Sequence, residues 1–187
     1  ITGLARESLK ATAFGAGVQM DAFEAAFRLP NILRRLFAEG AFAQAFVPIF
    51  AEYRRQRGQE ETRALVGRVG TLLTVALLVV TIIGVLAAPW LVYALASGFA
   101  ATPGKVQLTA DMIRIVFPYL LFISLTSIAG GVLNVHRRFA VPAFTPVLLN
   151  LAVIAAAWLG VPWFKSIGVQ PIYALAVGVM AGGVLQL

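Results

Sequence analysis

An uncharged, apolar stretch from Val69 to Ala96 constrains the fold more than any other part of this sequence. A helix of about 20 apolar residues crosses the hydrocarbon core of a bilayer, and this stretch is long enough to do so. The chain is 60% hydrophobic and 12% charged, whereas soluble domains carry about 25% charged residues. A soluble all-α protein would have to bury several such runs with almost no polar surface to cover them. We therefore expect an integral membrane protein.

Apolar runs separated by turns predict an all-α polytopic membrane protein with about six transmembrane helices. The expected segments are Ile1 to about Phe14, Met20–Tyr53, Val69–Ala96, Leu108–Val135, Val141–Trp158 and a last one from about Ile172. We expect Pro30 and Pro118 to kink their helices, because proline removes a backbone hydrogen bond. The charged stretch Glu52–Arg68 is expected to be a loop that leads into a helix, with a break at Gly58.

The second segment carries polar residues through its middle, between Asp21 and Phe50. A charge at the bilayer centre costs roughly 2.5–3.5 kcal/mol by insertion scales, so this segment must face something other than lipid. At 100° per residue, its main polar side chains fall within one sector of roughly 80°. They are Asp21, Glu24, Arg28, Asn31, Arg35 and Glu39. Arg34 lies about 60° from the nearer edge of that sector, and a kink at Pro30 would shift the phase.

Bases outnumber acids in the first two segments, which predicts a water-filled cavity for an anionic substrate. Arg6 and Lys10 are four residues apart and share a helix face. Arginine suits phosphate because its planar fork can bond two oxygens at once. The basic residues expected in the cavity are Arg6, Lys10, Arg28, Arg34 and Arg35. The alternative interpretation is snorkelling to the interface, or neutralisation by i, i+4 pairs within the helix. Those pairs are Glu24–Arg28 and Arg35–Glu39.

Four further polar residues have more than one interpretation. Asp21 follows a glycine-rich break and is either a helix N-cap or part of an outer gate. Asn31 makes either a local bond at the Pro30 kink or a gate contact. We expect Asn150 to form an interhelical hydrogen bond rather than to bind a ligand, and His136 to lie in a loop.

The residue inventory excludes several kinds of chemistry. The sequence has no cysteine and one histidine, so it holds no disulfide framework, cysteine-based zinc site or thiol nucleophile. It shows no nucleophile–base arrangement and no metal-ligand spacing, so we expect a transporter without a cofactor and not an enzyme. We assign the net charge of +7 to cytoplasmic loops and anionic lipid, not to nucleic acid.

Loop charges predict the orientation of the chain. Arginines cluster after the second and fourth segments, whereas the loops after the third and fifth carry only Lys105 and Lys165. By the positive-inside rule the clusters are cytoplasmic, so the sequence starts on the cytoplasmic side. Ile1 opens inside an expected helix, and the last apolar run stops without a cap. We therefore expect these residues to be part of a longer protein.

Several runs resemble one family of membrane proteins across the whole sequence. They are GLARESLKATAFGAG, DAFEAAFRLPNILRRLFAEGAFAQAFVPIFAEY, FPYLLFISLTSIAGGVLN, RFAVPAFTPVLLN and GGVLQL. Together they are similar to the MurJ (MviN) lipid II flippases of bacteria, within the multidrug/oligosaccharidyl-lipid/polysaccharide exporter superfamily. The resemblance implies a fold of about fourteen helices in two lobes, of which residues 1–187 would form most of the N-terminal lobe.

The resemblance also implies a function. Such a protein moves lipid II, the undecaprenyl-diphosphate-linked peptidoglycan precursor, from the inner to the outer leaflet of the bacterial inner membrane by alternating access. Arg6 and Arg34 would be cavity arginines that meet the diphosphate, and Glu7 stands where the family often has Asp. Straight-helix periodicity favours Arg35 over Arg34, but we expect Arg34 to face the cavity because Pro30 can rotate the later half of the helix.

The resemblance assigns three more residues of the second segment to family positions. These are Asp21, Asn31 and Glu39, the first two near the outward gate. The expected partners are lipid II and membrane lipids, and the expected state is a monomer. Coupling to the membrane potential or to a monovalent cation stays open. Two alternatives also stay open: a related exporter, either a polysaccharide-lipid flippase or an ion-coupled drug antiporter, and a non-transporting membrane scaffold.

Overall fold

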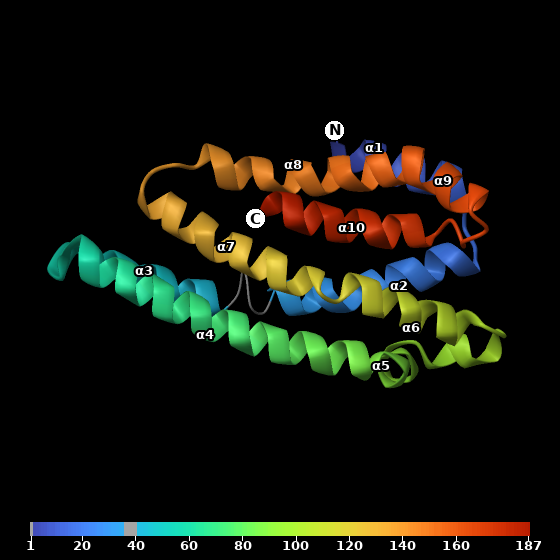
Figure 1. Ribbon diagram of the computed structural model, residues 1–187, viewed down its shortest axis with the longest axis horizontal. Coiled ribbons are helices and arrows are strands. Elements are labelled where there is room, and N and C mark those ends of the chain that lie inside the picture. Colours follow the sequence, from blue (N-terminus) through green and yellow to red (C-terminus); the bar gives the residue numbers. More distant parts are fainter. Residues whose placement is uncertain (1, 36–40) are drawn as a thin grey trace.

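The computed structural model describes residues 2–35 and 41–187, and the regular elements of these ranges are all helices. The α-helices are α1 (Thr2–Phe14), α2 (Val18–Arg34), α3 (Ala41–Gln56), α4 (Gly58–Leu86), α5 (Ala88–Leu95), α6 (Lys105–Val116), α7 (Tyr119–Val135), α8 (Ala140–Ala155), α9 (Val161–Ser166) and α10 (Tyr173–Gln186). A 3₁₀-helix, η2 (Ser97–Ala101), follows α5, and a π-helix, η3 (Ala156–Gly160), joins α8 to α9. The long helices run roughly along one axis, with α10 between α7 and α8 and with α4 at one edge (Figure 1).

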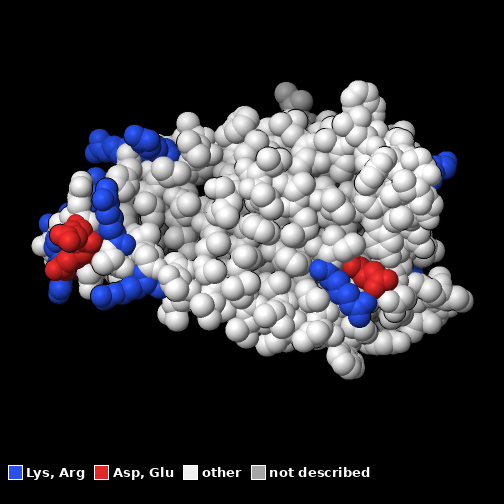
Figure 2. Space-filling view, viewed as in Figure 1, with Lys and Arg blue, Asp and Glu red and all other residues white. Residues whose placement is uncertain are grey.

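Three helical stretches of the described chain are long and apolar enough to cross a membrane. They are Gly58–Leu86, Lys105–Val135 and Ala140–Ser166. α10 is apolar but has only 14 residues. Figure 2 shows one face of the molecule whose middle is free of charge, as a surface in contact with lipid requires, with one blue and red group farther to the right. The charged side chains on this face gather mainly at the end where α3 leads into α4.

Prolines divide two of the expected segments into shorter helices. α6 ends before Pro118 and α7 begins after it, in agreement with the predicted kink. The expected single helix over Val69–Ala96 is wrong in its bounds, because α4 begins at Gly58 and a break at Ala87, just before Pro89, separates it from α5. Pro30 lies inside α2, which continues to Arg34.

The charged stretch Glu52–Arg68 was predicted as a loop that leads into a helix, with a break at Gly58. The break and the helix start are confirmed, but the loop is wrong, because the stretch is almost entirely helical. α3 continues to Gln56 and α4 begins at Gly58, whose φ of +80° lets the chain reverse within a tight turn. The second expected segment, Met20–Tyr53, corresponds to α2 and α3, and Figure 1 shows α3 leading on from α2 toward the same end. The charges sit on helix ends that can reach water, so they do not prevent helix formation.

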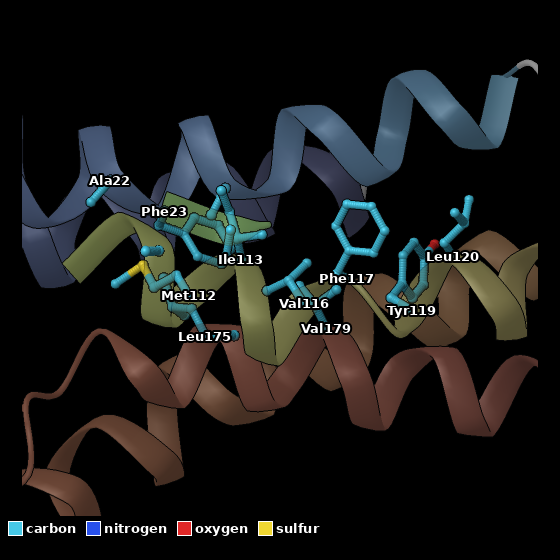
Figure 3. Close-up of a cluster of buried hydrophobic side chains, with 14 of the residues drawn as sticks. Ala22, Phe23, Met112, Ile113, Val116, Phe117, Tyr119, Leu120, Leu175 and Val179 are labelled. Carbon is cyan, nitrogen blue, oxygen red and sulfur yellow. The ribbon is translucent and has the colours of Figure 1, made fainter. Parts of the chain in front are cut away.

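The apolar core lies where α2, α6, α7 and α10 meet (Figure 3). Phe23 from α2 packs there with Ile113 from α6 and Leu175 from α10. Small residues bring the neighbouring helices close, as is common between membrane helices. A Cβ on Gly178 would lie 2.5 Å from the Cβ of Ala156 in η3, so α10 and η3 pack with no room for a side chain at this position. The core therefore fixes α2, which carries most of the predicted site.

Candidate functional site

A cavity of about 220 Å³ lies between α1, α2, α8 and α10. Its polar lining comes from the two charged helices, and its apolar wall comes from the other two and from the phenylalanines of α2. The lining residues are Arg6, Glu7, Lys10, Phe23, Glu24, Phe27, Asn31, Leu149, Val153 and Val179. Of the predicted site residues, the structure brings Arg6, Glu7, Lys10 and Asn31 together here.

Lys10 occupies the centre of the charged group. Its Nζ donates to Oε1 of Glu24 at 2.5 Å and lies 2.9 Å from Oε2 of Glu7. The Lys10 side chain is only 8% exposed, whereas those of Glu7 and Glu24 are about half exposed, at 52% and 48%. A buried ammonium is tolerated only when it is paired, and here carboxylates from two helices provide the pairing. Lys10 thus links α1 to α2.

Arg6 shares the carboxylate of Glu7 with Lys10. Its Nη2 and Nε lie 2.7 Å and 3.0 Å from Oε1 of Glu7. Its side chain is one-quarter exposed, so it faces the cavity from a partly buried position. The charges of Arg6, Glu7, Lys10 and Glu24 cancel within this group. Neutralisation by ion pairs was one of the sequence alternatives, but Glu24 pairs across helices with Lys10 and not with Arg28 as that alternative expected.

Asn31 and Arg34 connect this cavity to a second one. The Nε of Arg34 donates to Oδ1 of Asn31 at 3.1 Å, and Arg34 lines a cavity of about 460 Å³ against α7, α8 and α10. The polar part of its lining includes Thr126, Ser127, Asn134, Thr145 and Gln186. Arg34 is half-buried, whereas Arg35 is exposed.

The geometry of α2 explains this difference between neighbours. Ala22, Phe23 and Ala26 point into the core, so the predicted polar sector lies on the opposite face of the helix. Arg34 lies between the buried face and the polar sector, where α7 and α8 can reach it. Arg35 belongs to the polar sector itself and turns away from the bundle. Periodicity therefore grouped the residues of one helix face, of which Glu24 and Asn31 line the first cavity, but it did not select Arg34, which lines the second.

A third hollow, of about 520 Å³, lies between α2 and the segment that follows α5. Asp21, Glu24 and Arg28 line it from α2, and Phe99 lines it from the other side. The N-cap interpretation of Asp21 is wrong, because Gly17 is the N-cap and the backbone N–H of Asp21 donates to its carbonyl at 3.0 Å. Oδ2 of Asp21 instead lies 2.8 Å from Nζ of Lys105.

The amino-acid pattern does not predict that Lys105 and Glu24 are ion-pair partners. The pattern predicts a loop position for Lys105, yet its side chain is 10% exposed and its Nζ lies 4.0 Å from the ring centroid of Phe99. Lys105 pairs with Asp21 of α2, and Glu24 pairs with Lys10 of α1, so each ion pair joins two helices. Residue spacing along one helix cannot predict such contacts. Glu39 lies outside the described residues.

Two further predictions are confirmed. Nδ2 of Asn150 donates to Oγ1 of Thr2 at 3.1 Å, which joins α8 to α1 by an interhelical hydrogen bond. His136 is the C-cap residue of α7 and is exposed. Within the described ranges, no group of three or more histidine, cysteine or acidic side chains is placed to hold a metal ion.

Comparison with known proteins decides the family. The family model described as "Lipid II flippase MurJ" matches residues 10–187. The chain belongs to the MurJ lipid II flippase family. A "Lipid II flippase MurJ" of Burkholderia cenocepacia is 54% identical over 186 residues, which cover 100% of this chain and 35% of that protein. A "Probable lipid II flippase MurJ" of Vibrio cholerae is 43% identical over 195 residues and is covered to 36%.

The fold agrees with a solved MurJ structure. The structure described as "Lipid II flippase MurJ, inward closed conformation" superposes with a TM-score of 0.80 at 27% identity, over 99% of this chain and 37% of that one. The resemblance to MurJ and the all-α polytopic fold class are therefore confirmed. This chain spans little more than a third of these MurJ proteins, as expected for one lobe of a larger transporter. It is a multi-pass protein of the bacterial inner membrane.

Proposed function

We propose that this chain forms the N-terminal lobe of a flippase that moves lipid II from the inner to the outer leaflet by alternating access. Membership of the MurJ family carries the proposal, since the relatives are described as lipid II flippases. The placement of Arg6 and Arg34 supports it, because each lines a cavity of a membrane bundle from a partly buried position.

The two arginines are the proposed contacts to the diphosphate. Arg6 uses Nε and Nη2 on Glu7, and its Nη1 makes no hydrogen bond to the described residues. Asn31 fixes Arg34 through its Nε. The Arg6 guanidinium is held on one edge, so it presents Nη1 in a defined direction, which suits a phosphate oxygen.

Lys10 and Arg28 have different proposed roles. Lys10 is held by two carboxylates, so we assign it to positioning Glu7 and joining α1 to α2. Arg28 lies in the third hollow with Asp21, at the end of α2 where the family resemblance places the outward gate. Arg35 and Arg28 would face the space between this lobe and a second one, since both are on the side of α2 opposite the buried residues.

Transport is proposed to proceed without a bound cofactor, in a monomer, and to be driven by the membrane potential or by a monovalent cation. The clustered arginines at the turn between α3 and α4 support a cytoplasmic position for that turn, and α1 would then begin on the cytoplasmic side as well. The lipid tail would stay in the bilayer while the headgroup crosses through the cavity.

Reconstitution tests this proposal. The purified protein is placed in lipid vesicles with a fluorescent lipid II analogue, and loss of the analogue from one leaflet is followed with a membrane-impermeant quencher. Net movement that depends on the protein and on Arg6 supports the flippase. Transport of organic cations without lipid II movement would favour the drug antiporter, and transport of neither would favour a scaffold.

A further inference from the structure

A separate pocket of about 310 Å³ lies at the charged end of the bundle, between α3, α4 and the end of α7. Its main lining residues are Phe50, Arg54, Arg63, Val66, Val132 and His136. These three helices pack against one another, so the pocket is part of the folded bundle. None of its lining residues belongs to the cavities described above.

The pocket has an apolar layer beneath a cationic layer. Each helix contributes one apolar lining residue and one basic lining residue, and the basic one lies about a turn nearer the charged end of the bundle. The two are three or four residues apart, so they share a helix face. The pairs are Phe50 and Arg54 in α3, Val66 and Arg63 in α4, and Val132 and His136 in α7. The rings of Phe50 and His136 lie 6.2 Å apart at an angle of 47°. The pocket lining thus changes from apolar to basic at the same depth on all three helices.

The charge around the pocket is strongly positive. Residues 52–68 and 136–138 contain seven arginines and three glutamates, which gives a net charge of +4 with His136 neutral. Within the described part of the chain, no carboxylate pairs with Arg54 or Arg63, and Nη1 of Arg54 lies 3.4 Å from the carbonyl oxygen of Val135. Glu61 is paired with Arg57. Two guanidinium groups are therefore left to face the pocket.

We propose that this pocket binds the phosphate headgroup of an anionic phospholipid. Arg54 and Arg63 would bond the phosphate oxygens, and the apolar layer would hold the glycerol backbone and the first acyl carbons. Clusters of arginine next to membrane helices attract anionic lipids of the cytoplasmic leaflet. A free phosphate needs only the cationic layer, whereas a phospholipid uses both layers, and this favours the lipid. The pocket shares no lining residue with the cavities of α1 and α2, so this proposal does not depend on which substrate those cavities would bind.

Lipid binding to the purified protein tests this site. The protein is titrated in a neutral detergent with short-chain phosphatidylglycerol, and intact complexes are counted by mass spectrometry. The pocket variant is Arg54→Gln with Arg63→Gln. The matched control is Arg55→Gln with Arg68→Gln, which removes the same charge from the same two helices outside the pocket. All four arginines are exposed, so the variants are expected to fold.

The pocket variant is expected to bind the first phosphatidylglycerol on the order of 10-fold more weakly, while the control stays within a few-fold of the wild type. Phosphatidylcholine should bind the wild type and both variants equally. Equal losses in the two variants would overturn the proposal, since diffuse surface charge would then explain the binding. Displacement of the lipid by an equal concentration of inorganic phosphate would also overturn it, since the site would then take free phosphate.

Discussion

The Nζ of Lys10 lies 2.5 Å from Oε1 of Glu24, so an ion pair joins α1 to α2 at the wall of the first cavity. Removing Glu24 leaves a buried ammonium with only Glu7 as a partner. Glu24→Gln is therefore expected to lower the free energy of unfolding by about 1–2 kcal/mol, the range of a hydrogen bond to a charged group that is partly exposed. Thermal unfolding of the purified protein measures this loss. Glu60→Gln, a change on an exposed part of α4, is the control.

A second variant separates pairing from packing at this contact. Lys10→Met with Glu24→Leu removes both charges and keeps apolar volume, and such exchanges of ion pairs are often neutral or stabilising. The double variant should therefore unfold at a higher temperature than Glu24→Gln alone. If the double variant unfolds at the same temperature as Glu24→Gln or at a lower one, the charge on Lys10 stabilises the protein through more than its pair with Glu24.

The pair between Asp21 and Lys105 predicts an asymmetry between its two members. The Lys105 side chain is 10% exposed and that of Asp21 is 58% exposed. Asp21→Asn leaves a buried ammonium unpaired, whereas Lys105→Met leaves a carboxylate that water can solvate. Asp21→Asn is therefore expected to lower the unfolding temperature more than Lys105→Met. The reverse order would contradict the placement of Lys105 in the interior.

Gly178 tests the close packing of α8 and α10. A Cβ at this position would lie 2.5 Å from the Cβ of Ala156 and 3.3 Å from the carbonyl oxygen of Ala152. Gly178→Ala is expected to cost roughly 1–3 kcal/mol, because backbone and small side chains cannot move aside easily. Gly98→Ala, where a Cβ meets nothing within 4 Å, should have a much smaller effect. Equal unfolding temperatures for the two variants would contradict the observed helix contact.

The orientation of the chain can be tested by labelling single cysteines, since the sequence has none of its own. Arg57→Cys lies at the turn before α4, and Ser166→Cys lies at the end of α9. The arginine cluster predicts that Arg57→Cys is cytoplasmic and that Ser166→Cys faces outward. A membrane-impermeant thiol reagent applied to intact cells should then modify only the cysteine at 166. Modification of only the cysteine at 57 would reverse the proposed orientation.

Much of the fold could be predicted because it depends on local patterns. Apolar runs identified the helices between Val69 and the end of the chain, and Pro118 marked a real division between helices. The break at Gly58 was predicted, but the helical state of the charged residues before it was not, because their charges resemble those of a solvated loop. The uninterrupted run Val69–Ala96 likewise concealed the break before Pro89.

The candidate site was predictable in its residue types but not in its pairings. Periodicity placed the polar face of α2 on one side, and that face does lie opposite the core. It could not show that Lys10 pairs with Glu24, or that Lys105 is buried against Asp21, because these contacts depend on how separate helices pack. Arg34 enters a cavity from the edge of the core, and motif similarity identified it where the helical wheel favoured Arg35.

Comparing Arg34→Ala with Arg35→Ala tests the central claim most directly. The two residues are adjacent and carry the same charge, but only Arg34 is half-buried and hydrogen-bonded to Asn31 at the cavity. The measurement is the amount of lipid II in the outer leaflet of cells that depend on this protein, with insertion of each variant checked in parallel. Arg34→Ala is expected to reduce export about 10- to 100-fold, the effect of losing a charged hydrogen bond to phosphate, while Arg35→Ala exports normally. Wild-type export by a fully inserted Arg34→Ala protein would contradict the account.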